Sequence, residues 1–152
     1  MYVEFDTQYM DLALAEAAKA EAAGEVPVGA IVVFEEKVVA RGFNQPISAH
    51  DATAHAEIIA LREAGRALGN YRLSGVTMYC TVEPCMMCAG AMIHARIARL
   101  VFGTPDPKAG AAGSIYNVLT DPRLNHRVDV VTGVREDECA ALLRNFFARK
   151  RL

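Results

Sequence analysis

The chain has 152 residues, of which 53% are hydrophobic and 22% are charged, and its formal net charge is −2. That length suits one ordinary domain that buries about 70% of its unfolded surface, so we expect a single packed core over residues 1–152. The small net charge excludes a uniformly basic surface, so a nucleic acid would have to bind at a local basic patch.

The N-terminal sequence M-Y-V-E-F-D-T lacks the basic start and apolar run of a secretory signal. No stretch approaches the roughly 18 uninterrupted apolar residues of a membrane span, so we expect a cytoplasmic protein without a membrane partner. In that reducing compartment a close pair of cysteines indicates metal binding or catalysis rather than a disulfide. Cys80 and Cys139 have no such neighbour, and we expect them to be buried as small apolar side chains.

The first half of the chain predicts a helix, a hairpin and a second helix. Apolar residues recur at helical spacing over residues 6–24 and again over residues 54–69. Between them, two β-rich runs within residues 27–43 predict a hairpin, although the turn contains no glycine.

The second half alternates between the two kinds of element. We expect strands at 76–81, 99–103 and 128–133, and helices at 84–95, 114–119 and 136–149. Such alternation is typical of βαβ units, so the sequence predicts an α/β protein with a mixed sheet and helices on both faces.

Residues 80–90 read C-T-V-E-P-C-M-M-C-A-G, with Cys85 and Cys88 directly after a proline. Proline suits the first position of a helix, which would place both sulfurs in the first turn. There the free N–H groups and the helix dipole favour the thiolate, the form that binds metal or attacks a substrate. Taken alone, the motif is equally typical of a dithiol oxidoreductase.

The sequence T-A-H-A-E places His55 and Glu57 at the start of another predicted helix. Residues two apart on a helix point in nearly opposite directions, so a shared site has to lie beyond the helix end. If two helix starts face one point, His55, Cys85 and Cys88 match the ligands that zinc prefers. Three protein ligands are typical of a catalytic zinc site, where Glu57 could act as the proton acceptor. A structural site would need a fourth ligand, for which the candidates are His50, His94 and His126.

The motifs H-A-E and P-C-M-M-C resemble the H-x-E and P-C-x-x-C pattern of the zinc-dependent nucleoside and base deaminases. The stretches E-V-P-V-G-A, R-G-F-N, K-A-G-A-A-G-S and N-H-R-V are similar to the bacterial tRNA adenosine deaminases of that family along nearly the full length. The resemblance implies a cytidine-deaminase-like, three-layer α/β/α sandwich around a five-stranded mixed sheet. It also implies one zinc ion per subunit, held by His55, Cys85 and Cys88, with Glu57 as proton shuttle.

The implied reaction is hydrolytic deamination of adenosine to inosine at the wobble position of a tRNA anticodon, with the base turned out of its stack. By the same resemblance the substrate-binding residues are Asn44, Val28, Asp106, Lys108, Phe147 and Arg149. Members of the resembled family are homodimers, so we expect a homodimer that binds an anticodon stem-loop. Pro105 and Pro107, which flank Asp106, depart from the family pattern, so the shape of this loop is open.

Three alternatives share some of these features. A deaminase of a free nucleoside or base, such as cytidine or guanine, would have the same zinc chemistry without the RNA contacts. A dithiol oxidoreductase would use the two cysteines without metal. A zinc-stabilised RNA-binding module would have no use for Glu57 beside an open coordination position.

Overall fold

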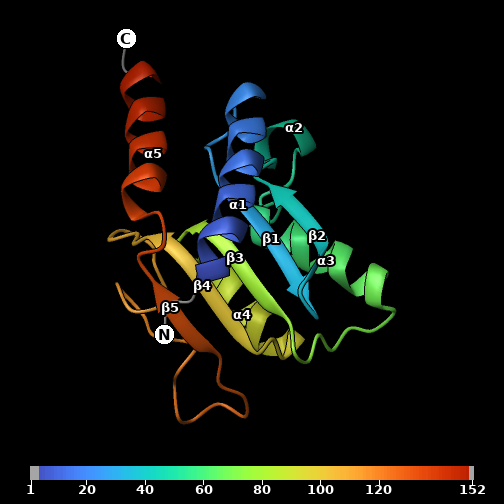
Figure 1. Ribbon diagram of the computed structural model, residues 1–152. Coiled ribbons are helices and arrows are strands. Elements are labelled where there is room, and N and C mark those ends of the chain that lie inside the picture. Colours follow the sequence, from blue (N-terminus) through green and yellow to red (C-terminus); the bar gives the residue numbers. More distant parts are fainter. Residues whose placement is uncertain (1–3, 151–152) are drawn as a thin grey trace.

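The computed structural model describes residues 4–150, which form a five-stranded sheet covered by helices on both faces (Figure 1). In chain order the elements are α1 (Glu4–Ala22), β1 (Gly29–Phe34), β2 (Lys37–Phe43), α2 (Pro46–Ala49), α3 (Ala56–Leu68), β3 (Thr77–Val82), α4 (Met86–Ala95), β4 (Arg99–Thr104), β5 (Asp129–Thr132) and α5 (Glu136–Lys150). No helix in the described part of the chain is long and apolar enough to cross a membrane.

The sheet has the strand order β2-β1-β3-β4-β5. Strand β1 is antiparallel to both of its neighbours, whereas β3, β4 and β5 are parallel. Strand β2 therefore runs in the same direction as the three parallel strands. The carboxyl ends of these four strands, at Phe43, Val82, Thr104 and Thr132, lie at one edge, which we call the carboxyl edge. The predicted mixed sheet is confirmed.

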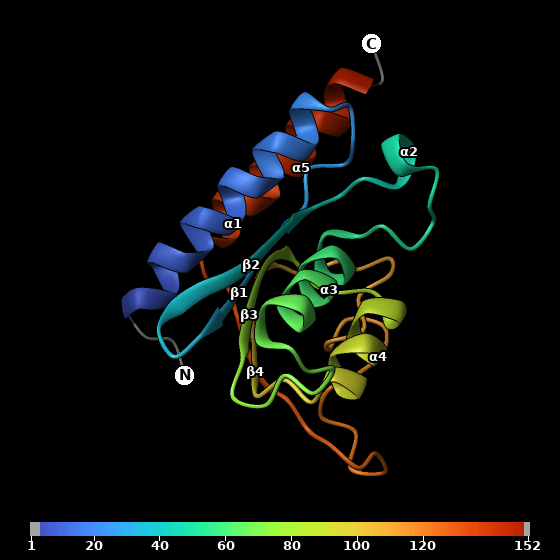
Figure 2. The ribbon, with the colours of Figure 1, turned by 90° about the vertical axis from the view of Figure 1, so that its right-hand side faces the viewer.

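Helices α1 and α5 lie on one face of the sheet, and α3 and α4 lie on the other (Figure 2). Side chains alternate between these faces along each strand. In β3, Met78 and Cys80 pack in the core with Met92 of α4, whereas Tyr79 packs with Met10 of α1. The three-layer sandwich follows from this alternation, and Cys80 is buried as predicted.

Two glycines let the helices approach the sheet closely. A methyl group at Gly29 would overlap the carbonyl oxygen of Ala13 in α1, and one at Gly42 would overlap the carbonyl oxygen of Ala56 in α3. Residue 42 lies one position before the end of β2, and residue 56 is the first of α3. This contact holds the start of α3 against the carboxyl edge.

The structure corrects two local predictions and confirms the hairpin. Residues 114–119 form turns rather than a helix, because the Ser114 amide donates its hydrogen bond to Glu83. Pro84 lies just before the N-cap residue Cys85, so it is not the first helical residue. The hairpin turn forms without glycine, since Glu35 and Glu36 adopt φ values of 51° and 64°, the left-handed conformations of a type I′ turn.

A buried ion pair ties α1 to the amino ends of β3 and β4. Asp6 is fully buried, and its carboxylate accepts hydrogen bonds from Arg99 Nη1 at 2.8 Å and Nη2 at 2.6 Å. The Tyr79 hydroxyl donates a third bond, at 2.6 Å, to the same carboxylate. The charge of Asp6 is therefore offset by a guanidinium at the end of the sheet opposite the carboxyl edge.

Candidate metal centre

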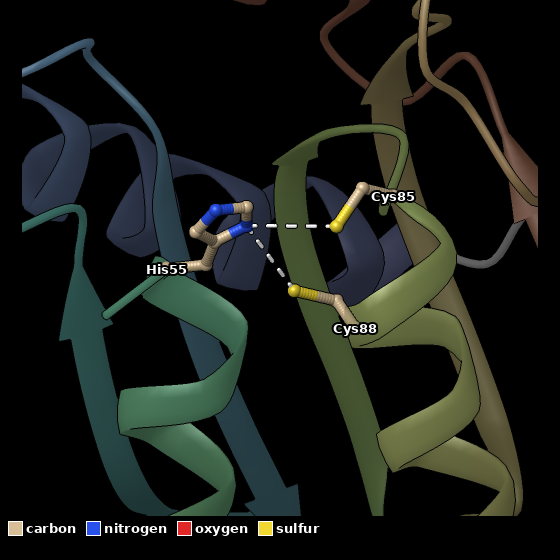
Figure 3. Close-up of side chains that lie close together, drawn as sticks. All are labelled: His55, Cys85 and Cys88. Carbon is tan, nitrogen blue, oxygen red and sulfur yellow. Dashed lines mark hydrogen bonds between the residues drawn. The ribbon is translucent and has the colours of Figure 1, made fainter. Parts of the chain in front are cut away.

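Two helices begin side by side at the carboxyl edge, and the side chains of His55, Cys85 and Cys88 converge between their N-termini (Figure 3). His55 is the N-cap residue of α3, with φ −73° and ψ 151°, and Cys85 is the N-cap residue of α4, with φ −76° and ψ 176°. Cys88 lies in the first turn of α4. Because both residues are N-cap residues, their side chains extend beyond the helix starts toward one point.

The three predicted ligand residues come together. His55 Nδ1 lies 3.6 Å from Cys85 Sγ and 3.5 Å from Cys88 Sγ (Figure 3). Their potential ligand atoms all lie within 4.8 Å of one another, and no other group of three His, Cys, Asp or Glu residues within 4–150 does so. One imidazole and two sulfurs are a donor set that suits zinc.

The fourth ligand of a structural zinc site is not found in the described part of the chain. His50, His94 and His126 lie outside the group formed by His55 and the two cysteines. The Nε2 atom of His126 instead lies 2.7 Å from the carbonyl oxygen of Ile97. Three protein ligands are the number typical of catalytic zinc sites.

Hydrogen bonds within the group favour an anionic sulfur. The pKa of Cys85 is lowered to about 3, chiefly by the hydrogen bond from Cys88 and also by the one from His55. The pKa of Cys88 is raised, because its thiol donates to Cys85, and the pKa of His55 is raised by its bond to Cys85. A thiolate is the form of cysteine that a metal ion binds.

Glu57 lies in the first turn of α3, two residues beyond His55. Its side chain is buried, with 4% of the residue exposed, and it has no salt bridge within residues 4–150. Burial raises the pKa of Glu57 to about 7. A carboxyl group that holds and releases a proton near neutral pH therefore lies beside the three candidate ligands.

Asn44 and Val28 also lie at this edge, after β2 and before β1. The Asn44 Oδ1 atom accepts a hydrogen bond from the Ala56 amide at 2.9 Å, so this side chain caps the start of α3. No hydrogen bond within the described residues engages its Nδ2 atom. Val28 packs in the same apolar cluster as Ala56 and Cys88.

The loop after β4 places Asp106 and Lys108 at the same edge. Asp106 Oδ1 accepts hydrogen bonds from the amides of Lys108, at 3.0 Å, and Ala109, at 3.2 Å, so this carboxylate shapes its own loop. Lys108 is exposed. The Asp106 amide donates to the buried carboxylate of Glu83 at 2.9 Å, a contact that the sequence did not predict.

The C-terminal residues Phe147 and Arg149 lie on α5, which extends past the sheet on the α1 side (Figure 1). Phe147 is 44% exposed and contacts the ring of Phe146 edge-to-face at 5.3 Å. Arg149 forms an ion pair with Glu21 in the last turns of α1. The structure does not bring these two residues to the metal group, and Arg151 of the predicted basic run lies outside the described residues.

Two buried glutamates near this edge, Glu25 and Glu83, were not identified from the sequence. Glu83 and Glu25 are 3% and 1% exposed, and each accepts hydrogen bonds from residues far along the chain, Glu83 from the loop after β4 and Glu25 from α2. The local signals were weak, because a glutamate next to a proline or at a helix end is ordinarily exposed.

Residues 3–104 match the family model of the cytidine and deoxycytidylate deaminase zinc-binding region. The chain is 49% identical over 149 residues to the tRNA-specific adenosine deaminase of Haemophilus influenzae, covering 97% of this chain and 86% of that protein. It is 46% identical over 146 residues to the tRNA-specific adenosine deaminase of Bacillus subtilis, covering 96% and 91% of the two chains.

Solved structures agree with this likeness. One comes from a study of A-to-I editing by tRNA:A34 deaminases at the wobble position, with a TM-score of 0.87 and 46% identity over 90% of this chain and 99% of that chain. The guanine deaminase of Nitrosomonas europaea is more distant in sequence, with a TM-score of 0.83 and 26% identity over 97% and 87% of the two chains.

Proposed function

This chain belongs to the cytidine and deoxycytidylate deaminase zinc-binding family, and we propose that it deaminates adenosine to inosine at the wobble position of a tRNA anticodon. The observation that carries the reaction type is the group of His55, Cys85 and Cys88 beside the buried carboxyl of Glu57. The choice of substrate is supported by the two relatives and the solved structure that act on tRNA. We take residues 1–152 as one deaminase domain.

In this proposal His55, Cys85 and Cys88 hold one zinc ion per chain, since their donor atoms suit zinc and lie within 4.8 Å of one another. A bound zinc ion would supply hydroxide at neutral pH by lowering the pKa of a water molecule to roughly 7. Both cysteines would bind zinc as thiolates, so binding would release the proton with which the Cys88 thiol now bonds to Cys85.

Glu57 moves the protons. Its carboxylate accepts the proton of the attacking water and delivers it to the ring nitrogen beside C6 of the adenine. It then carries the second proton of that water to the amino group, which leaves as ammonia, while the water oxygen stays on C6 as the carbonyl of inosine. Because Glu57 is buried, bulk solvent does not compete for these protons.

Residues around the edge would hold the nucleotide. The Nδ2 group of Asn44 remains available to donate to the nucleoside, because Oδ1 is bonded to α3. Val28 offers an apolar contact, and the loop of Asp106 and Lys108 borders the site. An unpaired base of an anticodon loop can turn out of its stack toward the metal group at a lower cost than a base in a duplex. Phe147 and Arg149 would contact RNA only farther from the metal group.

We also propose that two copies pair through α4. This helix is apolar nearly all round, and its outer residues Met86 and Met87 are 51% and 36% exposed. Surface grooves of about 540 Å³ and 500 Å³ lie along α4, the second of them between α4 and α3, and both are lined by Tyr71 and His94. A second subunit would cover this surface. Light scattering should give twice the chain mass of 16.5 kDa, and a single-chain mass would contradict the dimer.

Substrate choice tests the proposed function. The zinc-loaded chain is incubated with an anticodon stem-loop that carries adenosine at the wobble position, and with a matched stem-loop that carries it one position away. Free adenosine, cytidine and guanine are tested in parallel, with ammonia and inosine as readouts. We expect inosine from the first stem-loop alone. Faster release of ammonia from a free base or nucleoside would instead favour a small-base deaminase.

A further inference from the structure

Glu83 is a buried carboxylate that no step of the proposed reaction uses. It follows the last residue of β3 and is 3% exposed. Its Oε1 atom accepts hydrogen bonds from the Asp106 amide at 2.9 Å and the Ser114 hydroxyl at 2.5 Å. Its Oε2 atom accepts from the amides of Ala112 at 2.9 Å and Ser114 at 3.0 Å. All four donors belong to one loop, residues 105–114, which we call the mouth loop.

The backbone on both sides of this carboxylate holds the same loop. The Glu83 amide donates to the carbonyl oxygen of Thr104 at 2.9 Å, and the Ala111 amide donates to that of Pro84 at 2.8 Å. A methyl group at Gly110 would overlap the Glu83 carboxylate, so the loop passes over it in contact. These contacts hold the mouth loop against residues 83 and 84.

The Glu83 carboxylate lies between a proposed metal ligand and the mouth loop. Two residues after Glu83 comes Cys85, a proposed metal ligand, and the mouth loop carries Asp106 and Lys108, to which the proposed function assigns substrate contacts. No salt bridge within residues 4–150 offsets the charge of Glu83, so the N–H and O–H dipoles of the loop do so. Displacing the loop would leave a buried charge without partners, which is unfavourable.

We propose that Glu83 is a positioning residue, which sets the distance between the substrate-binding mouth loop and the metal ligands and acts through Asp106 and Lys108. This inference rests on the proposed function for its kinetic consequence. The anchoring itself is a property of the described hydrogen bonds.

The test is the Glu83→Gln variant, which keeps the size of the side chain. Glutamine presents an NH₂ group where two of the donors now point, so about half of the hydrogen bonds are lost. We expect KM for the wobble-adenosine stem-loop to rise roughly tenfold or more, with kcat within about threefold of wild type. Zinc content should be unchanged. Hydrogen exchange should accelerate at the amides of Asp106, Ala112 and Ser114.

Matched variants separate positioning from a loss of stability. Ser114→Ala removes one donor and should raise KM by a smaller factor, and Ser114→Thr restores the hydroxyl and should recover part of the effect. Tyr79→Phe removes a hydrogen bond to a buried carboxylate at the opposite end of the sheet. It should lower stability while leaving KM and exchange in the mouth loop unchanged. If Glu83→Gln does not fold, KM and hydrogen exchange of the Ser114→Ala and Ser114→Thr variants test the same proposal.

An unchanged KM, an equal fall of kcat at constant KM, or unaltered exchange in the mouth loop would overturn the proposal. If the wild-type chain deaminates no stem-loop, the proposed function fails, and the exchange measurement then decides whether Glu83 anchors the loop. Loss of zinc from Glu83→Gln would show that this residue supports the metal group rather than the mouth loop, which also contradicts the proposal.

Discussion

The start of α3 and the amino end of the sheet each bury a carboxyl group, but the surroundings of the two groups differ. Asp6 accepts hydrogen bonds from Arg99 and from the Tyr79 hydroxyl, so its charge is offset. Glu57 is also buried but has no salt bridge within residues 4–150, and its pKa is raised to about 7 by burial. At the amino end of the sheet, Asp6 thus links α1 to β3 and β4. At the carboxyl edge, Glu57 can take up and release a proton.

Location at the carboxyl edge does not explain this difference. Glu25 and Glu83 also lie at that edge, and burial alone would raise the pKa of each. Hydrogen bonds from Ser48 and Ile47 lower the pKa of Glu25 below its ordinary value, and donors of the mouth loop do the same for Glu83. The number of donors around each carboxylate therefore separates the structural glutamates from Glu57.

The largest effect is expected from removal of a metal ligand. Cys88→Ala should lower zinc content from about one ion per chain to near zero and abolish inosine formation, because two ligands hold zinc weakly. Elemental analysis of the purified variant checks this result. Cys139→Ala is the matched control, since Cys139 is equally buried but lies on the other face of the sheet. Full zinc content in Cys88→Ala would contradict the ligand assignment.

Glu57→Gln should lower turnover about 10²–10⁴-fold, the usual contribution of general acid–base catalysis. The variant should keep its zinc and should not unfold at a lower temperature, because a neutral amide is less costly to bury than an unpaired carboxylate. Single-turnover rates at saturating stem-loop, together with a melting curve, measure both quantities. Turnover within tenfold of wild type would contradict the proposed role of Glu57 in proton transfer.

Glu25→Gln measures how much a buried, hydrogen-bonded glutamate at the same edge contributes to stability. Glu25 accepts hydrogen bonds from the amides of Ile47 and Ser48 and from the Ser48 hydroxyl, so the substitution should cost about 2 kcal/mol of unfolding free energy at pH 7. Since the pKa of Glu25 is lowered in the folded state, this stability is present above its ordinary value of 4.5 and is lost as the pH falls below it.

Denaturant unfolding of Glu25→Gln and wild type between pH 7 and pH 3 checks the expected sign. The gap in unfolding free energy should narrow toward acid pH. Glu35→Gln, in the exposed hairpin turn, serves as the control and should leave stability unchanged throughout. A gap that stays constant down to pH 3 would mean that the Glu25 charge does not contribute.

Tyr79→Phe is expected to have the smallest effect. Loss of the 2.6 Å hydrogen bond to Asp6 should cost about 1–2 kcal/mol of unfolding free energy, because Arg99 still offsets the carboxylate. Deamination below the melting temperature should be unaltered. A selective loss of activity without loss of stability would show that the two ends of the sheet are coupled.

The metal group could be predicted from the sequence because its signals are local. The cysteine spacing and the position of His55 at a helix start depend on neighbouring residues. Strands β2 and β3, which precede the two helices, run in the same direction, so both helix starts lie at one edge. The mouth loop could not be predicted in this way. Residues 114–119 were predicted as a helix, but the Ser114 amide and hydroxyl bond to Glu83, 31 positions earlier.

Contacts of similar range involve two of the predicted substrate-binding residues. Asn44 is predicted to hydrogen-bond the nucleoside, and its Oδ1 atom also caps α3, twelve residues later. Arg149 was expected to bind phosphate, and the fold pairs it with Glu21 of α1. In each case the side chain bonds to a partner distant in sequence, and the residues next to it in the chain do not predict that partner.

Zinc titration tests the central claim most directly. The chain is stripped with a chelator, zinc is added back in steps, and inosine formed in the wobble-adenosine stem-loop is measured at each step. We predict that the rate is near zero at first and rises in proportion to zinc up to about one ion per chain, the content of a site with three protein ligands. Full activity in the stripped chain, or no inosine at one bound zinc per chain, would contradict the account.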